Sequence, residues 1–113
     1  MIEQIQPRDL SDWIARVTGP ATPLLLDVRE PLECRAVSVR AGGAELLQWP
    51  MHTVPARLIE LDHSRPIAVL CHHGGRSMQV ALFLEQRGFA CLANIAGGID
   101  AWALQLDDSL PRY

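Results

Sequence analysis

The sequence reads IAVLCHHGGRS at residues 67–77, and this stretch predicts a strand, a loop and the start of a helix. The four consecutive apolar residues at 67–70 are typical of a strand buried on both faces. The two glycines that follow relax the steric limits on a tight loop, and a helical pattern begins near Ser77. Cys71 is therefore expected at the carboxyl end of a buried strand, just before a helix N-terminus.

The surroundings of Cys71 favour its ionised form. A helix N-terminus carries a partial positive charge of about half a unit and presents unpaired N–H groups, and successive loop N–H groups can form an anion-binding nest. Arg76 adds a permanent cation, and no carboxylate lies between Asp62 and Glu85 in a chain of net charge −3. Such settings lower a cysteine pKa from about 8.5 to between roughly 3.5 and 7.5. The alternative, a small apolar residue that closes a core strand, explains neither the glycines nor the arginine, so we expect a reactive thiolate.

Short apolar runs and helical patterns alternate along the rest of the chain. Strands are expected at residues 2–6, 24–28, 37–39, 44–47, 67–70 and 89–94, and helices at residues 7–17, 30–33, 53–61, 77–87 and 99–106. This alternation predicts an α/β fold with a central parallel sheet of about five strands, covered by helices on both faces. Ligands bind outside the carboxyl ends of the strands in such sheets. Because Asp27 and Cys71 both occupy such ends, we expect them at one edge of the sheet.

Length and composition indicate one globular domain, residues 1–113, with residues 105–113 as a C-terminal tail. The chain is 49% hydrophobic and 20% charged, and its weak acidity without a basic stripe argues against a nucleic-acid partner. No apolar run approaches the ~20 residues of a membrane span, and the N-terminus lacks the features of a signal peptide, so we expect a cytoplasmic protein with no membrane partner. Three cysteines without a CxxC pair do not predict a disulfide framework, and Cys34 and Cys91 are expected to be ordinary apolar residues.

Three motifs in order resemble the single-domain rhodanese family of sulfurtransferases. They are the loop at residues 70–77, the segment LDVRE at residues 26–30 and the segment GGIDAW at residues 97–102. The segment VPARL at residues 54–58 is also similar to the family's helix before the catalytic strand. The chain departs from the family at residues 36–44, where AVSVRAGGA replaces the Gly-His-Ile-x-Gly-Ala stretch of many members and lacks its histidine.

The resemblance implies a rhodanese-like fold and a sulfurtransferase that needs no cofactor. It implies that Cys71 takes a sulfane sulfur from a small anionic donor such as thiosulfate, becomes a persulfide, and passes the sulfur to a thiol, cyanide or protein acceptor. Asp27 and Arg29 match the family's D-x-R segment, which supports the active-site edge. The substrate-binding loop implied by the match comprises His72, His73, Gly74, Gly75, Arg76 and Ser77.

The two loop histidines have two interpretations from sequence. Their rings could supply a cation below pH ~6.5 or move a proton, or only their backbone could matter. A metal site that uses Cys71, His72 and His73 is not expected, because adjacent residues rarely chelate one ion and no second ligand pair is spaced for zinc. Arg76 is expected to orient an anionic donor, with a surface ion pair or helix-start packing as the alternative.

The spacing C-x4-R at residues 71–76 favours sulfur over phosphate chemistry. Tyrosine phosphatases, and the dual-specificity phosphatases that share the rhodanese fold, have C-x5-R, and the extra residue enlarges the loop for a tetrahedral phosphate or arsenate. The tighter loop suits a single sulfur carried on the cysteine. Two alternatives stay open at this point: a persulfide carrier or binding module that acts on a protein partner, and a phosphatase or arsenate reductase on the same scaffold.

Overall fold

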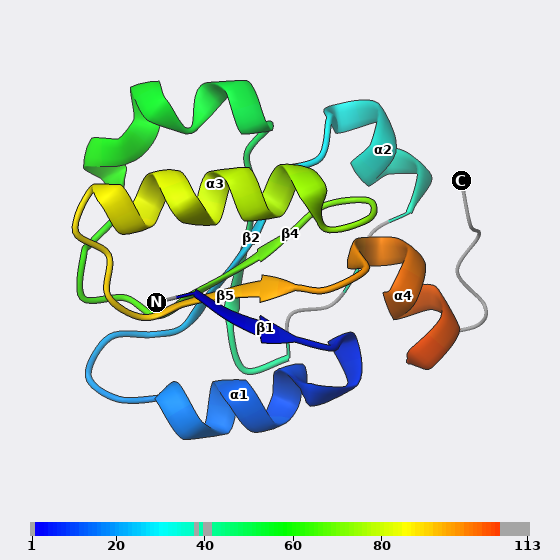
Figure 1. Cartoon of the computed structure of the whole chain (residues 1–113), viewed down its shortest axis with the longest axis horizontal. Helices are drawn as coiled ribbons and strands as arrows, with labels where there is room; N and C mark the ends of the chain where they lie inside the picture. Colours follow the sequence, from blue (N-terminus) through cyan, green and yellow to red (C-terminus); the bar gives the residue numbers. More distant parts are fainter. Residues whose placement is uncertain (1, 38, 40–41, 107–113) are drawn as a thin grey trace.

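Five strands alternate with helices along the chain (Figure 1). The structure, a computed structural model, describes residues 2–37, 39 and 42–106. The strands are β1 (Ile2–Ile5), β2 (Leu24–Asp27), β3 (Glu45–Gln48), β4 (Ile67–Leu70) and β5 (Leu92–Ile95). The helices are α1 (Leu10–Val17), α2 (Pro31–Ala36), α3 (Gly75–Gln86) and α4 (Gly98–Gln105), with 3-10 segments η1 (Pro7–Asp9), η2 (Met51–Thr53) and η3 (Pro55–Glu60).

The five strands form one sheet in the order β1-β5-β4-β2-β3, and every neighbouring pair is parallel. The three central strands are buried along their whole length, as expected for parallel strands covered on both faces. Their side chains alternate between two cores. Leu25 packs on the side of α1 and α4, whereas Leu24 and Leu26 pack on the side of α3 and η3. The predicted α/β fold with about five parallel strands is confirmed.

The structure corrects several predicted boundaries. Helix α3 begins at Gly75 rather than Ser77, because Gly74 takes a left-handed φ of 104° and ends the loop there. Strand β5 covers Leu92–Ile95 rather than residues 89–94. The amide of Phe89 instead donates to the carbonyl of Leu84 at 3.1 Å, which holds this residue against the end of α3.

The region between β2 and β4 differs most from prediction. The helix expected at residues 53–61 consists of two 3-10 segments, and the Thr53 hydroxyl donates to the carbonyl of Pro50 at 2.7 Å instead of capping a helix. The prediction of a strand at residues 37–39 is wrong for Val37 and Val39, because neither lies in a strand. Residue 38 lies outside the described residues.

Helix α4 ends at Gln105, and residues 107–113 of the predicted tail lie outside the described residues. Along the described part of the chain, no helix is both long enough and apolar enough to cross a membrane.

Candidate active site

The carboxyl ends of β2 and β4 bring the predicted site residues to one edge of the sheet. Asp27 at the end of β2 is in register with Leu70 at the end of β4, and Cys71 follows directly. The amide of Val28 donates to the carbonyl of Leu70 at 2.9 Å, so the two chain segments stay paired as they leave the sheet. The shared edge expected from sequence is confirmed, and the loop after β4 lies there between the starts of α3 and α4 (Figure 1).

The sulfur of Cys71 is enclosed by its own loop. The residue is 1% exposed, and the amide of Gly74 donates to Sγ at 3.0 Å. The hydroxyl oxygen of Ser77, in the first turn of α3, lies 3.3 Å from the same sulfur. A backbone N–H from the loop and a hydroxyl from the start of α3 therefore contact the sulfur of Cys71, the atom on which the expected chemistry depends.

A buried polar network holds the loop in this conformation. The Ser77 hydroxyl is bonded to the side-chain carbonyl of Asn94 on β5 at 2.5 Å and lies 3.1 Å from the carbonyl oxygen of Gly74. The Asn94 amide donates to Gln4 on β1 at 2.9 Å and to the Gly74 carbonyl at 3.4 Å. Sequence reasoning missed Asn94 and Gln4. The available signal was a lone amide, Asn94, in an otherwise apolar run.

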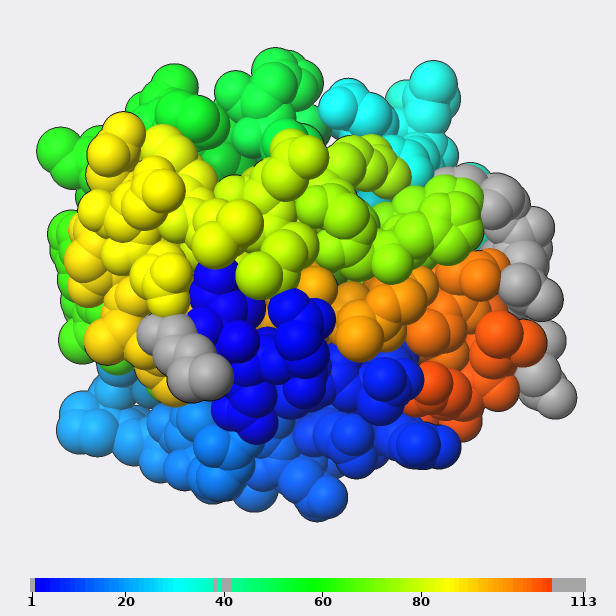
Figure 2. Space-filling view, in the orientation of Figure 1, coloured from blue at the N-terminus to red at the C-terminus, as the bar shows by residue number. Residues whose placement is uncertain are grey.

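The start of α4 docks on the backbone of the loop. The amide of Ile99 donates to the carbonyl of Cys71 at 2.8 Å, and the amide of Asp100 donates to the carbonyl of His72 at 3.1 Å. Gly98 makes this approach possible, because its φ is +57° and a Cβ there would lie 2.3 Å from the Cys71 carbonyl oxygen. In the space-filling view the yellow-green start of α3 and its loop meet the orange start of α4 (Figure 2). The second glycine of the GGIDAW segment thus allows α4 to pack against the loop.

Arg76 is bound to a carboxylate that sequence reasoning did not select. Its Nη1 and Nη2 atoms donate to the two carboxylate oxygens of Glu33 on α2 at 2.6 Å and 2.8 Å. The Arg76 side chain is 35% exposed and that of Glu33 is 19% exposed. Glu33 also accepts from the amide of Glu30 at 2.9 Å, as part of the capping box of α2. Arg76 therefore links α2 to the loop, and the predicted contact between Arg76 and a donor stays a prediction.

Asp27 and Arg29 form a buried ion pair at the carboxyl end of β2. Both side chains are fully buried, and Arg29 Nη2 donates to Asp27 Oδ2 at 2.7 Å. The thiol of Cys34 lies 3.7 Å from the same oxygen. Burial, followed by the negative charge of Asp27, raises the pKa of Cys34 to about 11. Cys34 is thus a protonated core residue, as expected from sequence.

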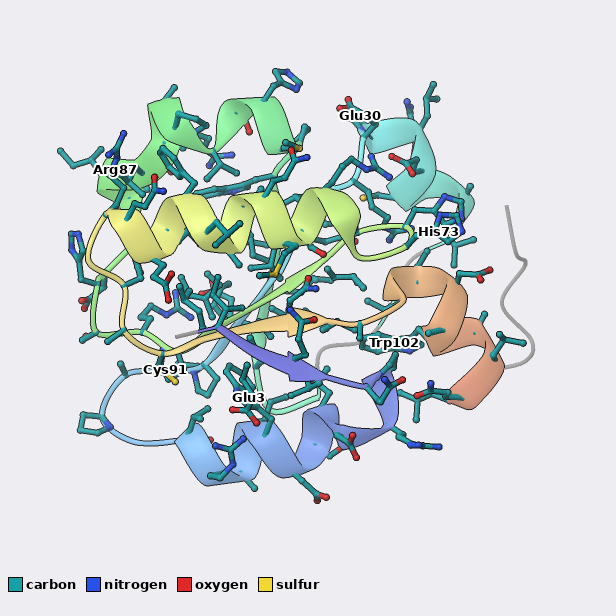
Figure 3. All side chains as sticks on the ribbon, viewed as in Figure 1. Glu3, Glu30, His73, Arg87, Cys91 and Trp102 are labelled. Atoms are coloured by element: carbon teal, nitrogen blue, oxygen red, sulfur yellow. The ribbon has the colours of Figure 1, made fainter. Side chains whose placement is uncertain are left out.

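Cys91 is the third cysteine and lies away from the loop. Burial is the main cause that raises its pKa. Figure 3 shows Cys91 toward one end of the molecule and His73 toward the other, where α2 and α4 lie. Neither Cys34 nor Cys91 has the surroundings of a reactive thiolate, which leaves Cys71 as the candidate nucleophile.

The two loop histidines stack on each other. Their ring centroids are 3.9 Å apart with an interplanar angle of 22°, and His72 is half-buried whereas His73 is exposed. Potential metal-ligand atoms of His72, His73 and Asp100 all lie within 4.8 Å of one another. Within the described part of the chain, this is the one such group of three His, Cys, Asp or Glu residues.

Comparisons with known proteins agree with this arrangement. Residues 7–105 match the family model of the rhodanese-like domain. A sulfurtransferase from Allochromatium vinosum is 34% identical over 103 residues, which cover 91% of this chain and 90% of that protein. The chloroplastic rhodanese-like/PpiC domain-containing protein 12 of Arabidopsis thaliana is 40% identical over 89 residues, which cover 79% of this chain and 30% of that protein. The crystal structure of a rhodanese-related protein from Thermoplasma volcanium superposes with a TM-score of 0.74 at 28% identity and covers 92% of this chain and 93% of that one. These findings support sulfur transfer as the general chemistry.

Proposed function

Because the chain belongs to the rhodanese-like domain family, we propose that it transfers sulfur through a persulfide on Cys71. The observation that carries the proposal is the contact set of the Cys71 sulfur, with the Gly74 N–H at 3.0 Å and the Ser77 hydroxyl at 3.3 Å. The Gly74 N–H is a donor fixed in place before the reaction, so it stabilises charge on the sulfur without reorganisation. The hydroxyl proton of Ser77 is donated to Asn94. The same loop would stabilise the thiolate before transfer and the persulfide anion after it.

The reaction has two covalent steps. In the first, the Cys71 thiolate attacks the outer sulfur of thiosulfate, the S–S bond of the donor breaks, and sulfite leaves with the electron pair of that bond. The enzyme then carries Cys–S–S⁻. In the second step, cyanide or a thiolate attacks the terminal sulfur, the Cys71 thiolate is released, and thiocyanate or a new persulfide forms. Ping-pong kinetics are expected for such a covalent intermediate.

The guanidinium of Arg76, at the start of α3, supports an anionic donor. The side chain of Arg76 is partly exposed while Glu33 holds it in place through two hydrogen bonds. A guanidinium fixed in this way can orient a sulfonate-like oxyanion with little loss of side-chain entropy. We assign to Arg76 the orientation of the donor and to Asp27 and Arg29 the support of the strand end beneath it.

The test is the intact mass of the protein before and after incubation with thiosulfate. The wild type should gain one sulfur atom, and cyanide should remove it. Cys71→Ser should gain none, whereas the matched variant Cys91→Ser should load like the wild type. A wild-type protein that stays unmodified by thiosulfate and other sulfane donors would refute the proposal. Complete loading followed by negligible turnover with cyanide would favour the carrier that acts on a protein partner.

A further inference from the structure

A second candidate site lies on the outer side of the same loop. It consists of His72, His73 and Asp100, whose potential ligand atoms lie within 4.8 Å of one another. Adjacent residues rarely chelate one ion, which argues against a metal site from sequence. Here the two histidine rings stack on each other, and Asp100 of α4 adds a third ligand that only the tertiary structure brings near them. Two imidazoles and one carboxylate form a ligand set typical of Zn²⁺ and related transition-metal ions.

The backbone holds the three residues together without a metal. The Asp100 amide donates to the His72 carbonyl at 3.1 Å, so the two side chains start from hydrogen-bonded backbone positions. The rings of His72 and His73 are stacked, with centroids 3.9 Å apart and an interplanar angle of 22°, so the two imidazoles lie next to each other. Figure 3 shows His73 at the end of the molecule where α4 begins. A metal ion would therefore bind to a group that the fold has already assembled.

Metal binding requires only a small movement of these three side chains. With metal–ligand distances of about 2.0–2.1 Å, neighbouring ligands of a tetrahedral zinc ion are about 3.3 Å apart. The three side chains must therefore close from at most 4.8 Å by roughly 1.5 Å. Because His73 is exposed, its side chain can rotate toward the other two ligands without displacing the core.

The local charge is compatible with a bound cation. Arg76, the permanent cation of the loop, is paired with Glu33 through two short hydrogen bonds. Asp100 then supplies a negative charge among the ligands, and the two imidazoles complete the set. We propose that His72, His73 and Asp100 form a site for a Zn²⁺-like divalent transition-metal ion, with three protein ligands and a fourth position left to solvent. This inference concerns metal binding alone and does not rest on the proposed sulfur transfer.

The experiment is calorimetric titration of the chelator-treated full chain with zinc chloride. Every variant carries Cys71→Ser, so that the thiol of the sulfur site cannot bind the probe, while Cys34 and Cys91 are present throughout. The expected result is one zinc ion per chain. Asp100→Asn and His73→Ala should each weaken binding at least tenfold, since even the partners of metal ligands contribute about 10- to 100-fold.

The matched control is His52→Ala, which removes an exposed imidazole on η2. It should bind zinc as tightly as the parent protein. Because His73 is exposed, His73→Ala should keep the thermal midpoint of the parent, so a loss of binding reports the ligand and not unfolding. With Co²⁺ as a second probe, the parent should gain visible absorption bands that His73→Ala lacks. Absence of zinc binding in the parent, or equal affinity in His73→Ala and His52→Ala, would overturn the proposal.

Discussion

Replacement of Gly98 by alanine tests how closely α4 must approach the loop that holds Cys71. The added Cβ would lie 2.3 Å from the Cys71 carbonyl oxygen and 2.5 Å from that of His72. These neighbours are backbone atoms, which cannot rotate away as the end of a side chain can. To reach even 3.0 Å from the Cys71 oxygen, the start of α4 must retreat by about 0.7 Å. That retreat strains or breaks the bonds from the amides of Ile99 and Asp100 to the same two carbonyls.

The cost in stability has two parts. The φ of +57° at Gly98 disfavours alanine by about 1–2 kcal/mol. Loss of two backbone hydrogen bonds adds about 0.5–1.5 kcal/mol for each. We therefore expect Gly98→Ala to lower the free energy of unfolding by about 2–5 kcal/mol, a large share of the 5–15 kcal/mol typical of a domain.

Urea denaturation followed by circular dichroism measures this loss. With a slope of about 1.5 kcal/mol per molar urea, the midpoint should fall by roughly 1.3–3.3 M. The matched control is Gly75→Ala on α3, where a Cβ would meet nothing within 4 Å. It should be neutral or stabilising by up to about 1 kcal/mol, because alanine favours a helix over glycine. A Gly98→Ala midpoint within about 0.5 M of the wild type, or an equal loss in Gly75→Ala, would refute the reasoning.

Two further substitutions separate roles around the loop. Arg76→Ala should slow thiosulfate loading about 100-fold, equivalent to about 2.7 kcal/mol. The same variant should lower the unfolding free energy by only about 1–2 kcal/mol, because it loses the pair with Glu33. Glu33→Ala should slow loading far less, and equal slowing in the two variants would show that Arg76 acts only through that pair. In the Cys71→Ser protein, Cys34 should resist iodoacetamide at pH 8, and its alkylation rate should rise up to pH about 11. The pKa of Cys34 is raised from 9.0 to about 11 in the folded protein. The neutral thiol therefore contributes stability that is present below pH 9.0 and is lost as the pH rises from 9.0 to about 11. An alkylation rate that levels off near pH 9 would contradict the raised pKa.

Local sequence patterns predict most of the fold. The apolar runs at residues 24–26 and 67–70 predict strands buried on both faces, and such strands are parallel because helices must cover each face. The position of Cys71 after one run and of Asp27 near the end of the other then predicts their shared edge, which the register confirms. These inferences succeed because burial periodicity and strand ends are properties of short segments.

The contacts that complete the site join residues far apart in the chain. Glu33 meets Arg76 across 43 positions, and Asn94 meets Gln4 across 90. No local pattern distinguishes Glu33 from the other carboxylates of its region, because the choice of partner depends on where α2 packs against the loop. The same holds for Asp100, which reaches His72 and His73 only once α4 has docked. Thus the amino-acid sequence by itself determined the parallel sheet and the edge at which Asp27 and Cys71 lie, whereas the packing of the helices on that edge decided which side chains surround the sulfur of Cys71.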